Sequence, residues 1–379
     1  MTAVPSQTDA PRTIVIGFRR WRAWNLRPML RAQGGTLRFV RDVAGAQAHG
    51  PGADDRVIVW GAGTPAGLPA LIAHSGATLV RVEDGFIRSV GLGSDLIPPR
   101  SLVFDPCGIY FDATRPSRLE QLLAQTAFDA ALCDRAARLR AIIVTRGLTK
   151  YNIENPAPPH WRSHGRQVVL VPGQVETDAS IALGCAAAGV RTNHALLVAV
   201  RAARPDAFVV YKPHPDVMAG NRRGALAARA THGLADHVET GASILACLAH
   251  ADELHTMTSL AGFDALLRGV PVVTHGMPFY AGWGLTHDCA GDHPAHRRRG
   301  RRLTLDELVA ATLLLYPHYW DPAKAAFVAA ESALAAIASE RDRLRASPAH
   351  DRHARGFWRR QGRKAGVLAW AWLGPGLRD

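Results

Sequence analysis

The sequence lacks long apolar runs and closely spaced cysteine pairs, and it has fewer acidic than basic residues. Its 379 residues include no stretch of about 18 apolar residues, so we expect no membrane-spanning helix. The five cysteines form no Cys-x-x-Cys pair, so we expect no disulfide framework and a reducing compartment. The first twelve residues are polar, so we expect no secretory signal peptide there. With 45 Lys and Arg against 32 Asp and Glu, the net charge of +13 favours anionic partners such as nucleic acid, anionic lipid or acidic substrates.

Short apolar segments alternate with longer helical patterns in both halves of the chain. This alternation predicts parallel sheets covered on both faces. The predicted strands are 13–17, 56–60, 78–82, 101–105, 108–111, 167–171, 208–211, 234–239, 253–257 and 271–274. Helices are predicted over 119–143, 193–203, 243–249, 259–268 and 322–345. We therefore predict an α/β fold with two Rossmann-like domains whose parallel sheets face a central crevice.

The stretch 149–165 contains three prolines and few residues that could pack, so it predicts a connection between domains. The predicted organisation is an N-terminal Rossmann-like domain over 11–148, the connection over 149–165, a C-terminal Rossmann-like domain over 166–320, and a helix with a basic tail over 321–379.

An acidic motif follows the predicted strand 78–82. Glu83 and Asp84 precede Gly85, and Arg88 comes three residues later. The carboxyl ends of strands are where α/β sheets bind ligands. We interpret the motif as a catalytic carboxylate with Arg88 beside it to hold an anionic substrate; the alternative is a polar surface turn.

Two further motifs follow strands in the second half. His214 lies between two prolines after Lys212, which restricts its backbone and favours one direction for its ring. Its alternative is a rigid loop with an incidental histidine. Thr258 and Ser259 precede a predicted helix, where hydroxyl and amide groups can bind phosphate, cap the helix, or both.

The loop after strand 167–171 adds polar candidates. Glu176 and Asp178 could act on substrate hydroxyls or favour a helix N-terminus, and the sequence leaves these alternatives open. Gln174 from this loop and Glu239 from strand 234–239 are also predicted to contribute to donor binding.

These segments together resemble the bacterial capsule polysaccharide synthesis proteins that are retaining β-Kdo transferases. The resembling segments are 83–95, 110–120, 171–180, 211–217, 256–269 and 278–286. The resemblance implies a GT-B-like fold, CMP-Kdo as donor, and a lipid-linked Kdo acceptor in synthesis of the capsule linker. It also implies a cytoplasmic protein at the inner face of the inner membrane, together with other capsule assembly proteins.

The sequence is also similar to bacterial sialyltransferases, which share an acidic-acidic-Gly motif and a His-Pro motif. The matching positions are Glu83-Asp84-Gly85 and His214-Pro215. The resemblance implies that the acidic residue is the catalytic base and that His214 contacts the donor phosphate. Thr258 and Ser259 look like the hydroxyl pair that holds this phosphate.

The chemistry of a CMP-linked acid sugar allows roles to be assigned. The single phosphate can be stabilised by a histidine and a helix N-terminus, so we predict no metal and no cofactor. Retention of configuration requires a carboxylate nucleophile and two displacements, for which Asp84 is our first candidate and Glu83 the second, with Glu176 also in the catalytic set. Arg88 and Lys212 are the candidate cations for the sugar carboxylate.

A cluster of His287, Cys289, His293 and His296 matches no zinc spacing. The arginine run 297–302 predicts a solvated face or one that contacts anionic lipid. The basic tail 352–364, with the nearby Phe357, Trp358, Trp370 and Trp372, either anchors to an anionic membrane or packs as a helix on the N-terminal domain.

Two alternatives to a Kdo transferase stay open. One is a transferase for another CMP-linked acid such as sialic acid, and the other is a non-catalytic scaffold of a capsule assembly complex. Nucleic acid is not an expected partner, because no recognition motif accompanies the positive charge.

Overall fold

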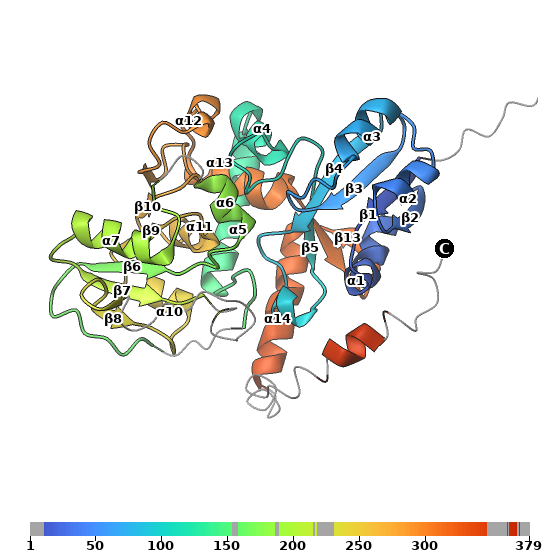
Figure 1. Cartoon of the computed structure of the whole chain (residues 1–379). Helices are drawn as coiled ribbons and strands as arrows, with labels where there is room; N and C mark the ends of the chain where they lie inside the picture. Colours follow the sequence, from blue (N-terminus) through green and yellow to red (C-terminus); the bar gives the residue numbers. More distant parts are fainter. Residues whose placement is uncertain are drawn as a thin grey trace, which may run out of the picture.

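The computed structural model describes residues 11–153, 158–185, 189–214, 217, 231–346, 362, 364–369 and 371. These residues form two α/β units that lie side by side, each around one sheet (Figure 1). No helix within the described residues is both long enough and apolar enough to cross a bilayer.

The first unit contains a seven-stranded sheet in the order β13-β12-β5-β4-β3-β1-β2. Its strands are β1 (Arg12–Ile16), β2 (Thr36–Val40), β3 (Arg56–Trp60), β4 (Thr78–Asp84), β5 (Ser101–Asp105), β12 (Pro317–Asp321) and β13 (Ala326–Val328). β2, β1, β3 and β4 are parallel, whereas β5, β12 and β13 each pair antiparallel with their neighbours. The first sheet is therefore mixed, where we had predicted a parallel one.

The strand residues of the first sheet divide between two cores because successive side chains point to opposite faces. Val15 packs with Leu26 of α1 (Arg20–Arg31), while Ile14 packs with Leu68 of α3 (Leu68–Ser75). Both faces are thus covered by helices, and α2 (Val43–Ala48) adds to the second face. A sheet buried in this way presents its loops only at the strand ends, which is where the site lies.

The second unit contains a six-stranded, all-parallel sheet in the order β11-β10-β9-β6-β7-β8. Its strands are β6 (Val168–Pro172), β7 (Phe208–Lys212), β8 (His237–Val238), β9 (Glu253–Thr256), β10 (Val272–Thr274) and β11 (His287–Asp288). Its helices are α6 (Ala179–Gly184), α7 (Asn193–Ala203), α10 (Ile244–Leu248), α11 (Leu260–Leu266) and α12 (Pro294–Arg298). Every residue of β6 and β7 is buried, as continuous apolar strands in parallel sheets require.

A shared hydrophobic core joins the two units. Phe86 of the first unit packs against Phe279 and Phe263 of the second, with ring centroids 4.8 Å and 6.2 Å apart. The helices at this junction are α4 (Arg118–Gln125), α5 (Ala130–Thr145), α13 (Leu305–Val309) with the π-helical turn Ala310–Leu315, and α14 (Ala330–Ala346). The units are therefore packed together through buried aromatic and aliphatic side chains as well as through the connection.

Three local predictions were wrong for identifiable reasons. The helix predicted over 119–143 is two helices, because Asp129 accepts a hydrogen bond from Leu132 N (2.8 Å) and starts α5 anew. The strand predicted at 108–111 is a loop, because the Asp105 carboxylate binds the amides of Cys107 and Gly108 at 2.8 Å each. The helix predicted from 322 begins only at Ala330, because β12 and β13 form a hairpin there.

The end of the chain also departs from the predicted layout. β12, which spans the predicted boundary at 320, pairs with β5 in the first sheet. The chain thus crosses back from the second unit before that boundary.

Candidate active site

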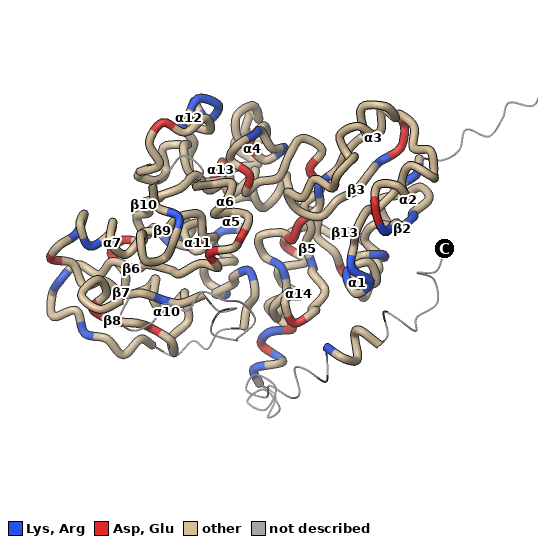
Figure 2. Tube along the Cα trace, in the orientation of Figure 1, with Lys and Arg blue, Asp and Glu red and all other residues tan. Residues whose placement is uncertain are grey.

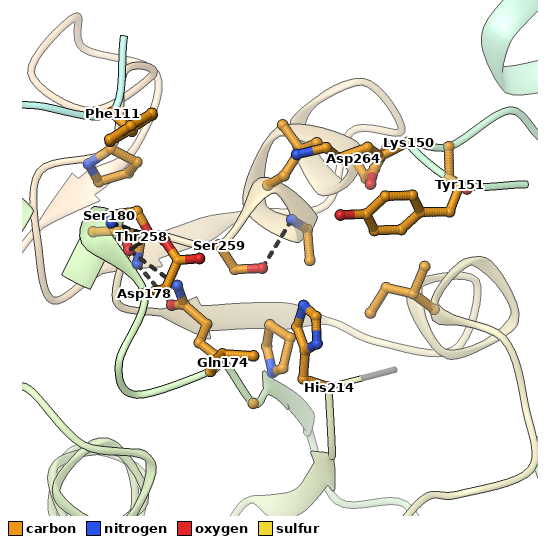
Figure 3. A pocket seen from close by; sticks show the side chains of 18 of the residues that line it. Phe111, Lys150, Tyr151, Gln174, Asp178, Ser180, His214, Thr258, Ser259 and Asp264 are labelled. Carbon is orange, nitrogen blue, oxygen red and sulfur yellow. Dashed lines mark hydrogen bonds between the residues drawn. The ribbon is translucent and has the colours of Figure 1, made fainter. Parts of the chain in front are cut away.

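A cavity of about 340 Å³ lies where the two units meet (Figure 3). Its walls come from three parts of the chain: the end of β4 with the loop 110–111, the connection 149–153, and the loops that follow β6, β7 and β9. Of the predicted site residues, those that line it are Glu83, Gln174, Lys212, His214, Thr258 and Ser259. A second-unit wall and a first-unit carboxylate therefore face one space.

Glu83 is the acidic residue of the first-unit wall. It is half-buried at the end of β4, and its Oε1 accepts a hydrogen bond from Asp84 N (3.0 Å). Burial and repulsion from Asp84 raise the pKa of Glu83 to about 7, although Lys150 and Arg22 act in the opposite direction. A carboxyl group with this pKa can exchange a proton near neutral pH.

Asp84 lies beside the cavity and is not among the residues that line it. Its Oδ2 accepts a hydrogen bond from Arg88 Nε at 2.6 Å, which is an ion pair. Its Oδ1 is buried and has no hydrogen-bond partner among the described residues. One oxygen of this carboxylate is thus fixed by a cation, and the other keeps its lone pairs.

Arg88 does not face the cavity, contrary to its predicted role toward the sugar carboxylate. The side chain is 3% exposed, and besides Asp84 it donates to Ser89 Oγ (2.8 Å) and Ile97 O (2.7 Å). Its guanidinium is therefore occupied by the protein. Arg88 thus positions Asp84. The sequence does not reveal this structural role, because the spacing of Arg88 from the acidic motif does not show which groups its side chain contacts.

The connection forms a third wall that the sequence analysis treated only as a linker. Lys150 O accepts a hydrogen bond from Arg88 N (3.0 Å), and Tyr151 O accepts one from Gly91 N (2.8 Å). Asn152 adopts a positive φ of 57° and donates from Nδ2 to Ser89 O (3.0 Å). The loop after the acidic motif thus fixes the connection at the cavity.

Lys150 brings a cation into the cavity. Although burial opposes its charge, Tyr151, Tyr110 and the carboxylates of Asp84 and Glu83 raise the pKa of Lys150 above its ordinary value. No side-chain hydrogen bond of Lys150 to the described residues occupies its ammonium. Lys150 is therefore a cationic group that a ligand can engage. The sequence analysis could have pointed to Lys150, because it lies in the predicted connection between the domains and ligand sites commonly lie at domain interfaces.

The second-unit wall carries His214 and Lys212. Lys212 is 8% exposed and donates from Nζ to Ala242 O (2.6 Å). Glu239 lies outside the cavity lining, where its carboxylate accepts hydrogen bonds from the amides of Gly241 (2.6 Å) and Ala242 (2.8 Å). Although burial opposes ionisation, these amides lower the pKa of Glu239 below its ordinary value. Glu239 thus shapes the loop that holds Lys212.

Ser259 begins α11 as its N-cap, and its Oγ accepts a hydrogen bond from Ala261 N (3.1 Å). The preceding amides are also occupied: Gln174 Oε1 binds Thr258 N (2.9 Å), and Thr256 Oγ1 binds Ser259 N (3.1 Å). Little of the helix N-terminus is therefore left for an anion. The hydroxyl proton of Ser259, opposite His214 in Figure 3, is still able to donate.

Gln174 and Thr258 form a polar pair behind Ser259. Gln174 Nε2 donates to Thr258 Oγ1 (3.0 Å), which in turn donates to Ser180 Oγ (3.3 Å). This chain of bonds orients Ser180 toward the cavity that it lines. Ser180 was missed by the sequence analysis, because a serine at the second position of a short helix has no distinguishing pattern.

Glu176 lies outside the cavity lining. Its Oε1 accepts a hydrogen bond from Asn193 N (2.8 Å) at the start of α7. Asp178 is the N-cap of α6, accepting from Ser180 N (2.8 Å), and lines the cavity. Of the alternatives for these acids, the structure favours helix stabilisation for Glu176.

The arginine run 297–302 is not the uniform solvated face that we predicted. Arg299 is 3% exposed and pairs with Glu120 (2.9 Å), which Arg298 also contacts (2.5 Å). Arg301 donates to Thr126 O (2.8 Å). Figure 2 shows basic residues along α12. Of the arginines in the run only Arg297 and Arg302 are exposed, because the others tie α12 and its following loop to α4 and to the segment after it.

The basic tail lies largely outside the described residues, including Phe357, Trp358, Trp370 and Trp372. Within its described part, Lys364 lies 3.0 Å from Asp95 of the first unit. This ion pair agrees with packing of the tail against the N-terminal unit.

Residues 55–319 match the family described as capsule polysaccharide biosynthesis protein. The chain belongs to this family. It is 43% identical over 321 residues to the capsule polysaccharide modification protein LipA of Neisseria meningitidis serogroup A, a match that covers 84% of this chain and 44% of LipA. The chain therefore spans less than half the length of this capsule protein relative.

Solved structures agree with the family assignment. The KpsC β-Kdo 2,4 transferase of Thermosulfurimonas dismutans is 33% identical, with a TM-score of 0.75 over 88% of this chain and 99% of that one. The KpsC β-Kdo 2,7 transferase from the same organism is 34% identical, with a TM-score of 0.69 over 87% and 99%. The predicted GT-B-like α/β fold and the predicted membership of the capsule Kdo transferase family are confirmed.

Proposed function

We propose that this capsule family member is a retaining glycosyltransferase that moves Kdo from CMP-Kdo to a lipid-linked Kdo acceptor. Its similarity to two Kdo transferase domains over most of its length supports this substrate class. The observation that carries the proposal is the arrangement of one cavity: Glu83 on one wall, His214 and Ser259 on the opposite unit, and Lys150 from the connection. A CMP-linked acid sugar presents an anomeric carbon, a phosphate and a carboxylate, which match these three groups.

The two adjacent acids are proposed to have different roles because their surroundings differ. A nucleophile must be ionised, and Asp84 is ion-paired with Arg88 and keeps one oxygen without a partner. Glu83, with a pKa of about 7, is suited to take up and return a proton. Asp84 would attack the anomeric carbon as CMP departs. Glu83 would then take the proton of the acceptor hydroxyl as that oxygen displaces Asp84.

The phosphate of the departing CMP is assigned to His214 and Ser259, which line the cavity from the second unit, whereas the two acids belong to the first. Charge-assisted hydrogen bonds from these groups would stabilise the leaving group without a divalent metal. The sugar carboxylate is assigned to Lys150, with Lys212 as a second cation, because the guanidinium of Arg88 is already occupied.

The test is incubation with CMP-Kdo and a synthetic lipid-linked Kdo acceptor, with the product linkage assigned by NMR. We expect one β-linked Kdo to be added, Asp84→Ala to abolish transfer, and Glu176→Gln to retain it because the Glu176 carboxylate binds the start of α7. Mass spectrometry of the stalled Glu83→Gln variant should show a Kdo adduct on Asp84. An adduct on another acid would show that this acid, and not Asp84, is the nucleophile. Transfer from CMP-sialic acid but not from CMP-Kdo would show that the donor is CMP-sialic acid.

We also propose a location at the inner face of the inner membrane, near other capsule assembly proteins. The exposed Arg297 and Arg302, together with the net charge of +13, support attraction to an anionic leaflet. Flotation with phosphatidylglycerol liposomes should show binding that salt weakens. Binding that is insensitive to both salt and lipid charge would contradict the electrostatic attraction.

A further inference from the structure

We propose that Arg22 and Trp60 form a subsite on the first unit that binds the carboxylate of an acidic sugar at the end of the acceptor. This inference rests on the proposed function, because it assigns the acceptor for that same cavity. Its ligand class is a carboxylated sugar ring, recognised by a guanidinium and an aromatic face.

The subsite lies at one edge of the first sheet. β1, β3 and β4 are adjacent and parallel, so their carboxyl ends lie together. Arg22 is in the first turn of α1 after β1, Trp60 is the last residue of β3, and Glu83 is near the end of β4. Gly61 connects the last two: a Cβ at this position would lie 3.2 Å from Glu83 Oε2. The aromatic ring thus belongs to the strand end that abuts the catalytic carboxylate.

The guanidinium of Arg22 lies over an aromatic ring, and no hydrogen bond to another described residue holds it. Its Cζ lies 4.1 Å from the centroid of the Trp60 ring and 5.1 Å from that of Trp21. Its Nε is buried and has no hydrogen-bond partner among the described residues. Burial lowers the pKa of Arg22, and only the through-space attraction of Glu83 and Asp84 opposes this effect. A stacked guanidinium keeps its N–H edges for a planar, two-oxygen ligand, and a carboxylate has that geometry.

The position of Arg22 favours the acceptor over the donor. The groups assigned to the donor phosphate, His214 and Ser259, belong to the second unit, whereas Arg22 and Trp60 belong to the first. The acid pair lies at the end of β4, next to β3 in the same sheet. A sugar that stacks beside Trp60 with its carboxylate on Arg22 would present its hydroxyl groups toward Glu83, the proposed base. Figure 2 shows further basic residues along α1, all of them arginines, which favour an anionic chain on this side.

The test compares two acceptors that differ only in the terminal sugar acid, as a carboxylate or as its carboxamide. We expect the wild type to prefer the carboxylate by about tenfold or more in kcat/KM, as loss of a charge-assisted hydrogen bond implies. Arg22→Gln should abolish this preference, measured as the ratio of kcat/KM for the two acceptors so that any change in the acid pair affects both values alike, and Arg22→Lys should restore part of it. Arg31→Gln, at an exposed position on the same helix, is the matched control and should behave as wild type.

Two outcomes would overturn the subsite. One is a preference for the carboxylate that survives in Arg22→Gln. The other is an Arg22→Gln variant in which hydrolysis of CMP-Kdo and transfer fall equally while the preference for the carboxylate acceptor is unchanged. This result would mean that Arg22 only balances the negative charge of Glu83 and Asp84. Binding of the methyl glycoside of Kdo, followed by saturation-transfer NMR, separates this failure from failure of the proposed function. A wild type that transfers no Kdo but binds the glycoside through Arg22 refutes the function alone, and binding equal in Arg22→Gln and wild type refutes the subsite.

Discussion

Glu83→Gln is expected to stabilise the folded protein at alkaline pH while it removes transfer. In the folded state burial and Asp84 raise the pKa of Glu83 from its ordinary 4.5 to about 7. Between these values the folded protein holds a proton that the unfolded chain has released, so the free energy of unfolding falls as pH rises from 4.5 to 7. At about 1.4 kcal/mol per pH unit, this difference corresponds to at most about 3 kcal/mol. Because Glu83 is partly solvated and coupled to Asp84, we expect about 2 kcal/mol.

The assay is urea unfolding followed by tryptophan fluorescence at pH 4.5 and pH 8. The variant should be more stable than wild type by about 2 kcal/mol at pH 8, and most of the gain should be absent at pH 4.5, where the wild-type carboxyl is protonated in the folded protein and half-protonated in the unfolded chain. Asp54→Asn, at an exposed turn, is the control for loss of one negative charge. A gain of equal size at both pH values would show that the proton affinity of Glu83 is not raised, and its proposed role as acid and base would fall with it.

Three other substitutions test the frame around the cavity. Glu120→Ala should lower the free energy of unfolding by about 3 kcal/mol in urea titrations, because it leaves the buried Arg299 without its carboxylate; a loss below 1 kcal/mol would contradict this. Gly262→Ala should destabilise by about 1–3 kcal/mol and raise the KM for CMP-Kdo, because the new Cβ would lie 2.7 Å from Tyr280 Cζ at the start of α11; an unchanged thermal midpoint would show that this contact relaxes. Burial lowers the pKa of His275 from 6.5 to about 4. The free energy of unfolding of the wild type is therefore highest above pH 6.5, and the contribution of His275 to it is lost as pH falls toward 4. His275→Gln should reduce this acid sensitivity by about 3 kcal/mol, and parallel stability curves for both proteins would refute it.

The sequence predicted the residues whose chemistry depends on strand ends. Glu83 lies at the end of β4, and His214 and Ser259 follow β7 and β9; the rule that strand carboxyl ends carry ligands was sufficient to bring them to one cavity. The sequence could not show that Glu83 lines the cavity whereas Asp84 lies beside it, because the register is a property of the folded sheet. It also could not show that the donors of Arg88 are already taken by its own loop.

Lys150 and the β12–β13 hairpin show a second kind of limit. The segment around Lys150 has no periodic pattern, and its place in the cavity comes from hydrogen bonds to the loop 88–91, sixty residues earlier in the chain. β12 joins β5, more than two hundred residues away in the sequence. Such pairings depend on which sheet edge is open once the rest has folded, and a local pattern does not contain that information.

The return of β12 and β13 to the first sheet has a consequence for how such units are combined. The first strand and the last long helix of the described fold belong to the same half of the molecule, so a cut between the halves would remove an edge of the first sheet from its partner strands. The first half is therefore not an independent folding unit of continuous sequence, because it depends on a segment from which the second half separates it in the sequence. This layout is compatible with the longer relatives, of which the chain covers 44%.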